Sequence, residues 1–69
     1  MRRKLIGINN FTDRDYEKVY VLEKDDGTIK TLREIYTSGT NYLIKSFITY
    51  ENPYDLDFDF LEISMWEEL

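Results

Sequence analysis

Hydrophobic and polar residues alternate along much of this chain, a pattern typical of β-strands that have one face on a core. Residues 3–8 read as a first strand, with Leu5 on one face and Ile6 and Ile8 on the other. Residues 17–24 read as a second strand of good β-forming side chains, with apolar residues on both faces at positions 19–22. Asp26-Gly27 follows, and this dipeptide favours the positive φ that a tight hairpin requires. We therefore expect two strands and a reversal of the chain at residues 25–28.

The next segment fits two structures. It can continue the hairpin as a second arm, but Thr31-x-x-Glu34 is a capping box and Gly39 is a natural helix terminator. The leucine, isoleucine and tyrosine in between also recur at helical spacing. We expect a short strand at residues 28–31 and a short helix at residues 32–38.

Residues 42–50 are apolar on both faces of an extended strand. Tyr42, Ile44, Ile48 and Tyr50 share one face, with Leu43 and Phe47 on the other. A helical stripe through the same segment is the alternative, but the β-branched and aromatic content favours a strand. We expect a central strand, buried on both faces, that ends at Asn52-Pro53, because proline cannot donate to a β-ladder.

The C-terminal segment alternates and then changes phase. Leu56, Phe58 and Phe60 are expected to face a core. Apolar residues after Phe60 have the opposite parity, which a β-bulge near Phe60-Leu61 would correct. A helical end, or a strand covered on both faces, is the alternative.

These elements predict an α+β fold, a small β-rich single domain over residues 1–69 with a curved antiparallel sheet and one short helix. An all-β small barrel of five strands is the alternative. The chain has 69 residues, 42% hydrophobic and 16% aromatic, which is too apolar for a disordered chain. Large aromatic side chains supply buried area that so small a domain needs.

Charge is distributed unevenly. Residues 1–34 carry eight Lys/Arg and seven Asp/Glu, whereas residues 35–69 carry one and seven, so the net charge of −5 lies in the second half. There is no cysteine, and the apolar run near the N-terminus is too short for a signal peptide or a membrane span, so we expect a cytoplasmic protein. Residues with AT-rich codons number 28 against 8 with GC-rich codons, which indicates a phage or low-GC bacterial origin.

Catalysis and metal binding are disfavoured by composition. The chain lacks histidine and cysteine, the usual general base and the strongest common nucleophile. Asp57 and Asp59 would stand about 7 Å apart on one strand face, but a solvated strand face explains them better. Asp55 also begins a D-x-D-x-D run, yet Phe60 and Trp66 occupy the positions at which a calcium loop needs glycine and glutamate. We expect no enzyme, cofactor or metal.

Direct nucleic-acid binding would have to use the N-terminal half. Arg2, Arg3 and Lys4 form a basic start, and six tyrosines offer stacking surfaces. A helix–turn–helix placed over residues 31–46 would present only Lys45 as a cation on its second helix, which is too little for phosphate contact. We expect no nucleic-acid binding and keep a small nucleic-acid-binding β domain as an alternative.

An acidic strip with two aromatic residues is the strongest candidate for a binding surface. Acidic side chains at alternate positions of one strand face, with Trp and Tyr among them, suit a protein interface with a basic partner. The predicted partner-binding residues are Glu51, Tyr54, Asp55, Asp57, Asp59, Glu62, Trp66, Glu67 and Glu68.

We therefore expect a protein-binding module, such as a small inhibitor that mimics nucleic-acid charge and blocks the basic surface of a nucleic-acid-handling protein. A structural subunit that associates with itself through an exposed strand is a further alternative, as is a strip that serves only solubility or edge protection. The oligomeric state is expected to be a monomer or a small homo-oligomer.

Overall fold

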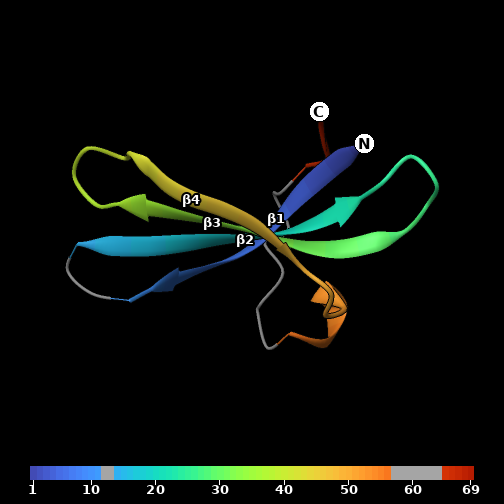
Figure 1. The fold of residues 1–69 in the computed structure, drawn as a ribbon, viewed down its shortest axis with the longest axis horizontal. Coiled ribbons are helices and arrows are strands. Elements are labelled where there is room, and N and C mark those ends of the chain that lie inside the picture. Colours follow the sequence, from blue (N-terminus) through green and yellow to red (C-terminus); the bar gives the residue numbers. More distant parts are fainter. Residues whose placement is uncertain (12–13, 57–64) are drawn as a thin grey trace.

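A computed structural model describes residues 1–11, 14–56 and 65–69 of the chain. Within them, five strands form one unclosed antiparallel sheet in the order β4-β3-β2-β1-β5 (Figure 1). The elements are β1 (Arg2–Asn10), β2 (Asp15–Glu23), β3 (Ile29–Thr37), β4 (Leu43–Thr49), the 3₁₀ turn η1 (Pro53–Asp55) and β5 (Glu67–Glu68). The sheet twists strongly, and the two chain ends lie side by side (Figure 1), where the Leu69 amide donates to the Met1 carbonyl.

The first two predicted strands and the reversal after them are confirmed. β1 contains residues 3–8, β2 covers all but the last residue of 17–24, and residues 24–28 join β2 to β3 in a tight turn. Gly27 has φ +85°, a conformation that glycine adopts without steric cost. The Gly27 amide donates to the Lys24 carbonyl at 2.9 Å, and the Thr28 amide donates to the Asp26 carboxylate at 2.9 Å.

The helix expected at residues 32–38 is wrong, because this segment continues β3. Nine residues of β3 pair with nine of β2, from Glu23 opposite Ile29 to Asp15 opposite Thr37. The capping-box residues have other roles: Thr31 donates its hydroxyl to the Glu51 carbonyl, and Glu34 is paired with Arg3. The described fold is therefore β-rich with almost no helix, and the α+β description holds only in part.

The expected central strand is also misplaced. Residues 43–49 do form a strand, β4, but it lies at the end of the sheet order and pairs only with β3 among the described strands. A register shift leaves Ile44 without a Cα partner in β3, since Ile35 lies opposite Lys45 and Tyr36 lies opposite Leu43. In this position at the end of the sheet, the apolar side chains of β4 are largely exposed instead of buried.

The two faces of the sheet carry separate apolar clusters. We call them the Ile6 face, where Ile6, Val19 and Val21 are buried, and the Tyr20 face, where Tyr20, Leu22 and Leu32 are buried. β2 supplies both clusters because successive side chains of a strand point to opposite faces. It is the middle strand of the sheet, which explains why its residues 19–22 are all buried.

The chain after β4 turns at the predicted Asn52-Pro53. Asn52 caps η1 by accepting from the Tyr54 amide at 3.0 Å, and Pro53 is buried. η1 packs against β2 and β3, and Leu56 contacts the Ile6 cluster, as a core position should. The predicted core residues Phe58 and Phe60, and the bulge near Phe60-Leu61, lie outside the described residues.

The alternative of a closed five-stranded barrel is wrong for the described part of the chain, since β4 and β5 end the sheet without pairing to each other. No helix in the described residues has the length and apolar character needed to cross a membrane.

Candidate functional site

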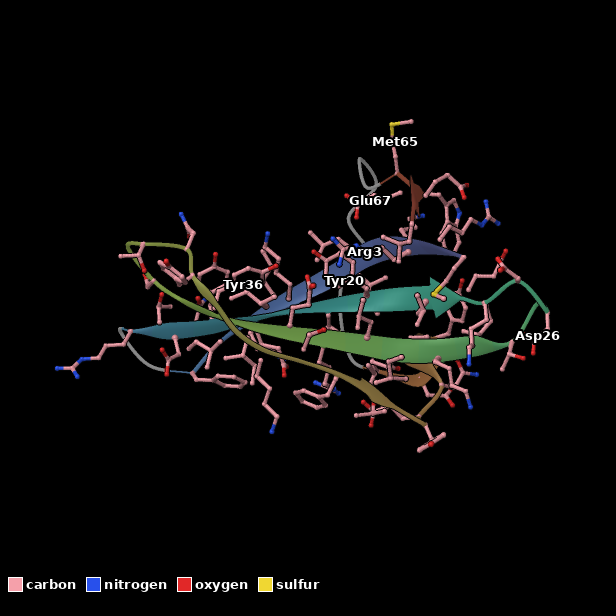
Figure 2. The ribbon with its side chains drawn as sticks, turned by 45° about the horizontal axis from the view of Figure 1, so that its top comes forward. Arg3, Tyr20, Asp26, Tyr36, Met65 and Glu67 are labelled. Carbon is pink, nitrogen blue, oxygen red and sulfur yellow. The ribbon has the colours of Figure 1, made fainter. Side chains whose placement is uncertain are left out.

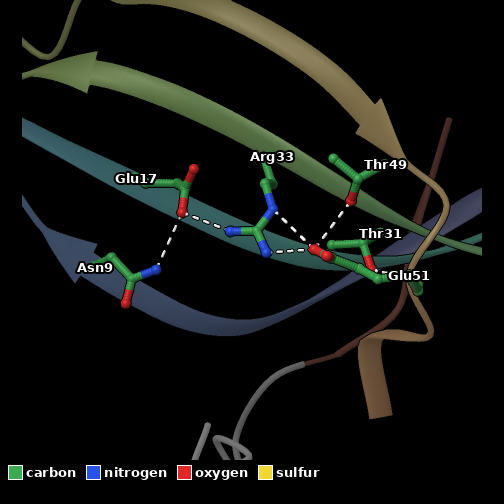
Figure 3. Close-up of polar contacts among 6 residues, drawn as sticks. All are labelled: Asn9, Glu17, Thr31, Arg33, Thr49 and Glu51. Atoms are coloured by element: carbon green, nitrogen blue, oxygen red, sulfur yellow. Dashed lines mark hydrogen bonds and ion pairs between the residues drawn. The ribbon is translucent and has the colours of Figure 1, made fainter. Parts of the chain in front are cut away.

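An ion-pair cluster centred on a buried carboxylate lies on the Ile6 face and joins three strands with the segment that follows β4 (Figure 3). Glu17 of β2 is only 4% exposed, and its carboxylate accepts from Arg33 of β3 at 2.9 Å and from Asn9 of β1 at 3.0 Å. Arg33 Nε also donates to Glu51 at 3.1 Å. We call Asn9, Glu17, Arg33 and Glu51 the Arg33 cluster.

Glu51 lies at the outer end of the Arg33 cluster, where Arg33 and Thr49 bind its carboxylate. Arg33 reaches its carboxylate through two nitrogens, and the Thr49 hydroxyl donates to the same oxygen at 3.0 Å. The hydrogen bonds from Arg33, and then that from Thr49, lower the pKa of the Glu51 carboxyl. Thr31 donates to the Glu51 carbonyl at 2.9 Å. Glu51 therefore has a structural role that the sequence analysis did not foresee.

A second charged cluster lies on the Tyr20 face. Arg3 of β1 pairs with Glu34 of β3 at 3.1 Å and with Glu67 of β5, and its guanidinium carbon lies 4.3 Å from the centroid of the Tyr20 ring. Tyr36 donates its hydroxyl to Glu34 at 2.9 Å. Arg3, Tyr20, Tyr36 and Glu67 lie on the same side of the sheet in Figure 2. Together with Glu34 they form what we call the Arg3 cluster.

Burial raises the pKa of Tyr20, the tyrosine at the centre of the Arg3 cluster. Tyr20 is 7% exposed, and desolvation raises its pKa to about 12, although the positive charge of Arg3 acts in the opposite direction. Desolvation and the hydrogen bond to Glu34 also raise the pKa of Tyr36. Tyr36 stacks on Tyr16, with ring centroids 5.4 Å apart. At neutral pH Tyr20 and Tyr36 are therefore uncharged and serve packing and hydrogen bonding.

Trp66 is held against the sheet. It is half-buried, packs on the Ile6 cluster, and lies under the guanidinium of Arg2 at 4.0 Å from the ring centroid. Arg2 also forms an ion pair with Glu23 at 3.0 Å. Of the two aromatic residues predicted to anchor a partner, Trp66 is thus largely engaged within the chain, and only Tyr54 is 52% exposed.

The other predicted partner-binding residues fall into three groups. Asp55 in η1 and Glu68 in β5 are exposed, whereas Glu51 and Glu67 are bound to arginines. Asp57, Asp59 and Glu62 lie outside the described residues. Glu51 follows β4, η1 with Tyr54 and Asp55 packs against β2 and β3, and Glu67–Glu68 form β5 at one end of the sheet, so the described members come from three separate segments. Their role in binding stays a prediction.

β4 and the residues that flank it hold five of the eleven exposed large apolar residues of the described structure. Leu43, Ile44 and Ile48 are 48%, 54% and 48% exposed, and the flanking Tyr42 and Tyr50 are 74% and 87% exposed. Scattered apolar residues are normal on a protein surface, but a contiguous group is typical of an interaction site. Because these five residues share one strand and its ends, they are the second candidate site, which we call the β4 edge.

The Arg33 and Arg3 clusters were missed in the sequence analysis, although a signal was present. Glu17 has the same parity as Val19 and Val21, so a carboxylate was to be expected on an apolar face, where it needs a partner. Assigning residues 32–38 to a helix removed Arg33 from that face.

Comparisons with protein-family models, with curated proteins and with solved structures found no match to this chain. In the ranges 1–11, 14–56 and 65–69 no group of His, Cys, Asp and Glu is arranged to hold a metal ion, and no pocket is found.

Proposed function

We propose that this chain is a non-enzymatic protein-binding module whose partner presents a basic surface, such as that of a nucleic-acid-handling protein that the module inhibits by mimicking nucleic-acid charge. The observation that carries the proposal is the use of the arginines. Arg2, Arg3 and Arg33 are each bound to carboxylates of the same chain, so these cations are not available to a polyanion.

The remaining negative charge supports the same proposal. Asp55 and Glu68 are exposed, and four of the fourteen acidic residues lie outside the described residues. Those four, Asp13, Asp57, Asp59 and Glu62, make up most of the net charge of −5, since the described residues hold ten acidic and nine basic side chains. Complementary charge speeds association with a basic partner and makes it dependent on salt.

The absence of histidine and cysteine supports the non-enzymatic part of the proposal. We also propose a cytoplasmic location, because the chain holds no cysteine and so uses no disulfide of the kind that stabilises many small secreted domains.

The test is a charge-neutral variant measured against the partner that a pull-down and mass spectrometry identify. Asp55→Asn, Asp57→Asn and Asp59→Asn together should leave melting unchanged, and should slow association and reduce its salt dependence. The matched control makes the same change in net charge elsewhere, with Asp13→Asn, Asp15→Asn and Asp25→Asn, which leaves the Asp26 carboxylate of the β2–β3 turn in place. Equal effects of the two triple variants would show that total charge acts rather than a recognition surface.

A fluorescence titration separates this proposal from the nucleic-acid alternative. We expect no binding of duplex DNA or single-stranded oligonucleotide at physiological salt, because binding to phosphates requires free Lys and Arg side chains. Salt-sensitive binding in the micromolar range would instead support a nucleic-acid-binding domain that uses the N-terminal half.

A further inference from the structure

The β4 edge lacks the usual protection of an edge strand. Natural edge strands avoid pairing with other chains through charges, proline, bulges or short length. β4 has seven residues and contains one charge, Lys45, and its bulge at Ile44 lies near one end. From Lys45 to Thr49 the strand is regular and pairs on one side with β3. Among the described strands it has no neighbour on the other side.

The composition of β4 is that of a central strand, although the fold places it at an end. Residues 42–50 are apolar on both faces, the pattern of a strand with neighbours on both sides. A second strand docked on β4 would reconcile the sequence with the position. The remaining question is which strand fits.

The order of side chains in β4 identifies that strand. Within β4, alternate residues read Ile44, Ser46, Ile48, which is the same in both directions about Ser46. Antiparallel pairing of identical strands places residue i opposite residue j and j opposite i, so a segment with this symmetry is complementary to itself.

We propose that two copies of this chain pair antiparallel through β4, with Ser46 of one copy opposite Ser46 of the other. Ile44 then faces Ile48, which is a favourable cross-strand pair. Lys45 faces Phe47, so the only cation of the strand meets an aromatic ring and not its own copy. The register thus opposes no like charges.

The pairing closes at two copies. An antiparallel pair related by a two-fold axis keeps the same face of both sheets on the same side, so the two Tyr20 faces become continuous through Leu32 and Ile48, which are cross-strand partners. At the other end of the described sheet, β5 has only two residues, and both are glutamates. Short and charged edges resist pairing. The product is a dimer and not a fibre.

Disulfide trapping tests the register, because the natural chain contains no cysteine. Ser46→Cys should form a covalent dimer quickly under a mild oxidant, since directly opposed residues lie within the Cα separation that a disulfide spans. Ile48→Cys is the matched control on the same strand. Its two copies would lie four residues apart along the strand direction, about 14 Å, which is beyond disulfide reach. Equal trapping of both variants, or of neither, would overturn the proposal.

Sedimentation of the unmodified chain and of a repulsive variant is the second test. Ser46→Lys would oppose two like charges at the two-fold axis, whereas within each copy the new cation would lie beside Glu34. We expect a concentration-dependent dimer for the natural chain, a monomer for Ser46→Lys with unchanged melting, and a dimer for the control Ser38→Lys in the β3–β4 turn. A natural chain that stays monomeric up to roughly 1 mM would contradict the proposal.

This dimer does not depend on the proposed basic partner. The acidic residues named for that partner lie outside residues 42–50, so the Ser46→Lys variant separates the two proposals. A monomeric variant that still binds the partner would show that recognition does not require the dimer.

Discussion

Glu17 shows how a single residue can determine the arrangement of its neighbours. A buried carboxylate is costly unless it is paired and hydrogen-bonded, and Glu17 meets both conditions through Arg33 and Asn9. Arg33 is itself directed by Glu51 beyond the end of β4. The Arg33 cluster therefore connects β1, β2 and β3 with the segment that follows β4, and it constrains their relative register.

Removing the cation of this cluster should leave a buried charge without its main partner. We expect Arg33→Met to lower the free energy of unfolding by about 3–5 kcal/mol, a large part of the roughly 3–10 kcal/mol available to a chain of this size. Urea denaturation measures the loss. The double variant Arg33→Met, Glu17→Gln should recover much of it, since the buried charge is then absent. A double variant as unstable as the single one would show that lost packing of Arg33, and not the unpaired carboxylate, causes the effect.

Tyr20 should make stability fall at alkaline pH. Its folded-state pKa is raised to about 12 from an ordinary value of 10.0, so the unfolded chain releases this proton first. Stability is complete below pH 10 and is lost as pH rises toward 12, by about 2–3 kcal/mol. Tyr20→Phe should remove this part of the decline in melts taken between pH 9 and pH 12. Tyr42→Phe, at an exposed position, should retain it, and identical pH profiles for the two variants would contradict the assignment.

At the scale of elements, the sequence patterns predicted the structure correctly where that structure depends only on neighbouring residues. The Asp-Gly turn, the alternation of β1 and β2 and the stop at Asn52-Pro53 depend on a few neighbouring residues, and all three are found in the fold. The segment of residues 32–38 also carried a local helix signal, in the capping box and the glycine after it. Nine cross-strand pairs with β2 overrode it, because pairing in register gives every β3 residue a partner that a short helix would lack.

The turn at Gly27 should be sensitive to chirality. Gly27 has φ +85° and open space around the position of a β-carbon, so strain and not a clash decides the effect of substitution. We expect Gly27→Ala to cost about 1 kcal/mol in the free energy of unfolding. A synthetic chain with D-alanine at this position should instead be more stable than the natural one, because D-residues favour positive φ. Equal destabilisation by both enantiomers would point to an unseen contact.

The position of β4 could not be predicted from its own sequence. Apolar residues on both faces indicate two neighbours, but the sheet order depends on which strands pair with β3 and β1, and that depends on contacts distant in the chain. The same limit applies to the candidate site. Alternation predicted that Glu51 would be a free member of an acidic strip, whereas its pairing with Arg33 follows from strand register.

For the whole molecule, the C-terminal residues are held mainly by one side chain. β5 has two exposed residues and pairs only with Arg2 and Arg3 in the described structure, which is too little to keep a chain end in place by itself. Trp66 adds the apolar contact with Ile6, Val19 and Val21. As the sole tryptophan, it also reports on this docking by fluorescence.

We therefore expect Trp66→Ala to release the C-terminal end and to destabilise the whole sheet. For a half-buried aromatic side chain the cost should be about 2 kcal/mol, below the 3–5 kcal/mol of a fully buried one. Hydrogen exchange should show the Leu69 amide, which donates to the Met1 carbonyl at 3.0 Å, losing most of its protection, whereas the β2 amides should lose only as much as the lower global stability requires. Met65→Ala is the matched control, since its side chain is 83% exposed. Unchanged protection of Leu69 in Trp66→Ala would show that the Arg3–Glu67 ion pair holds the chain end without the aromatic contact.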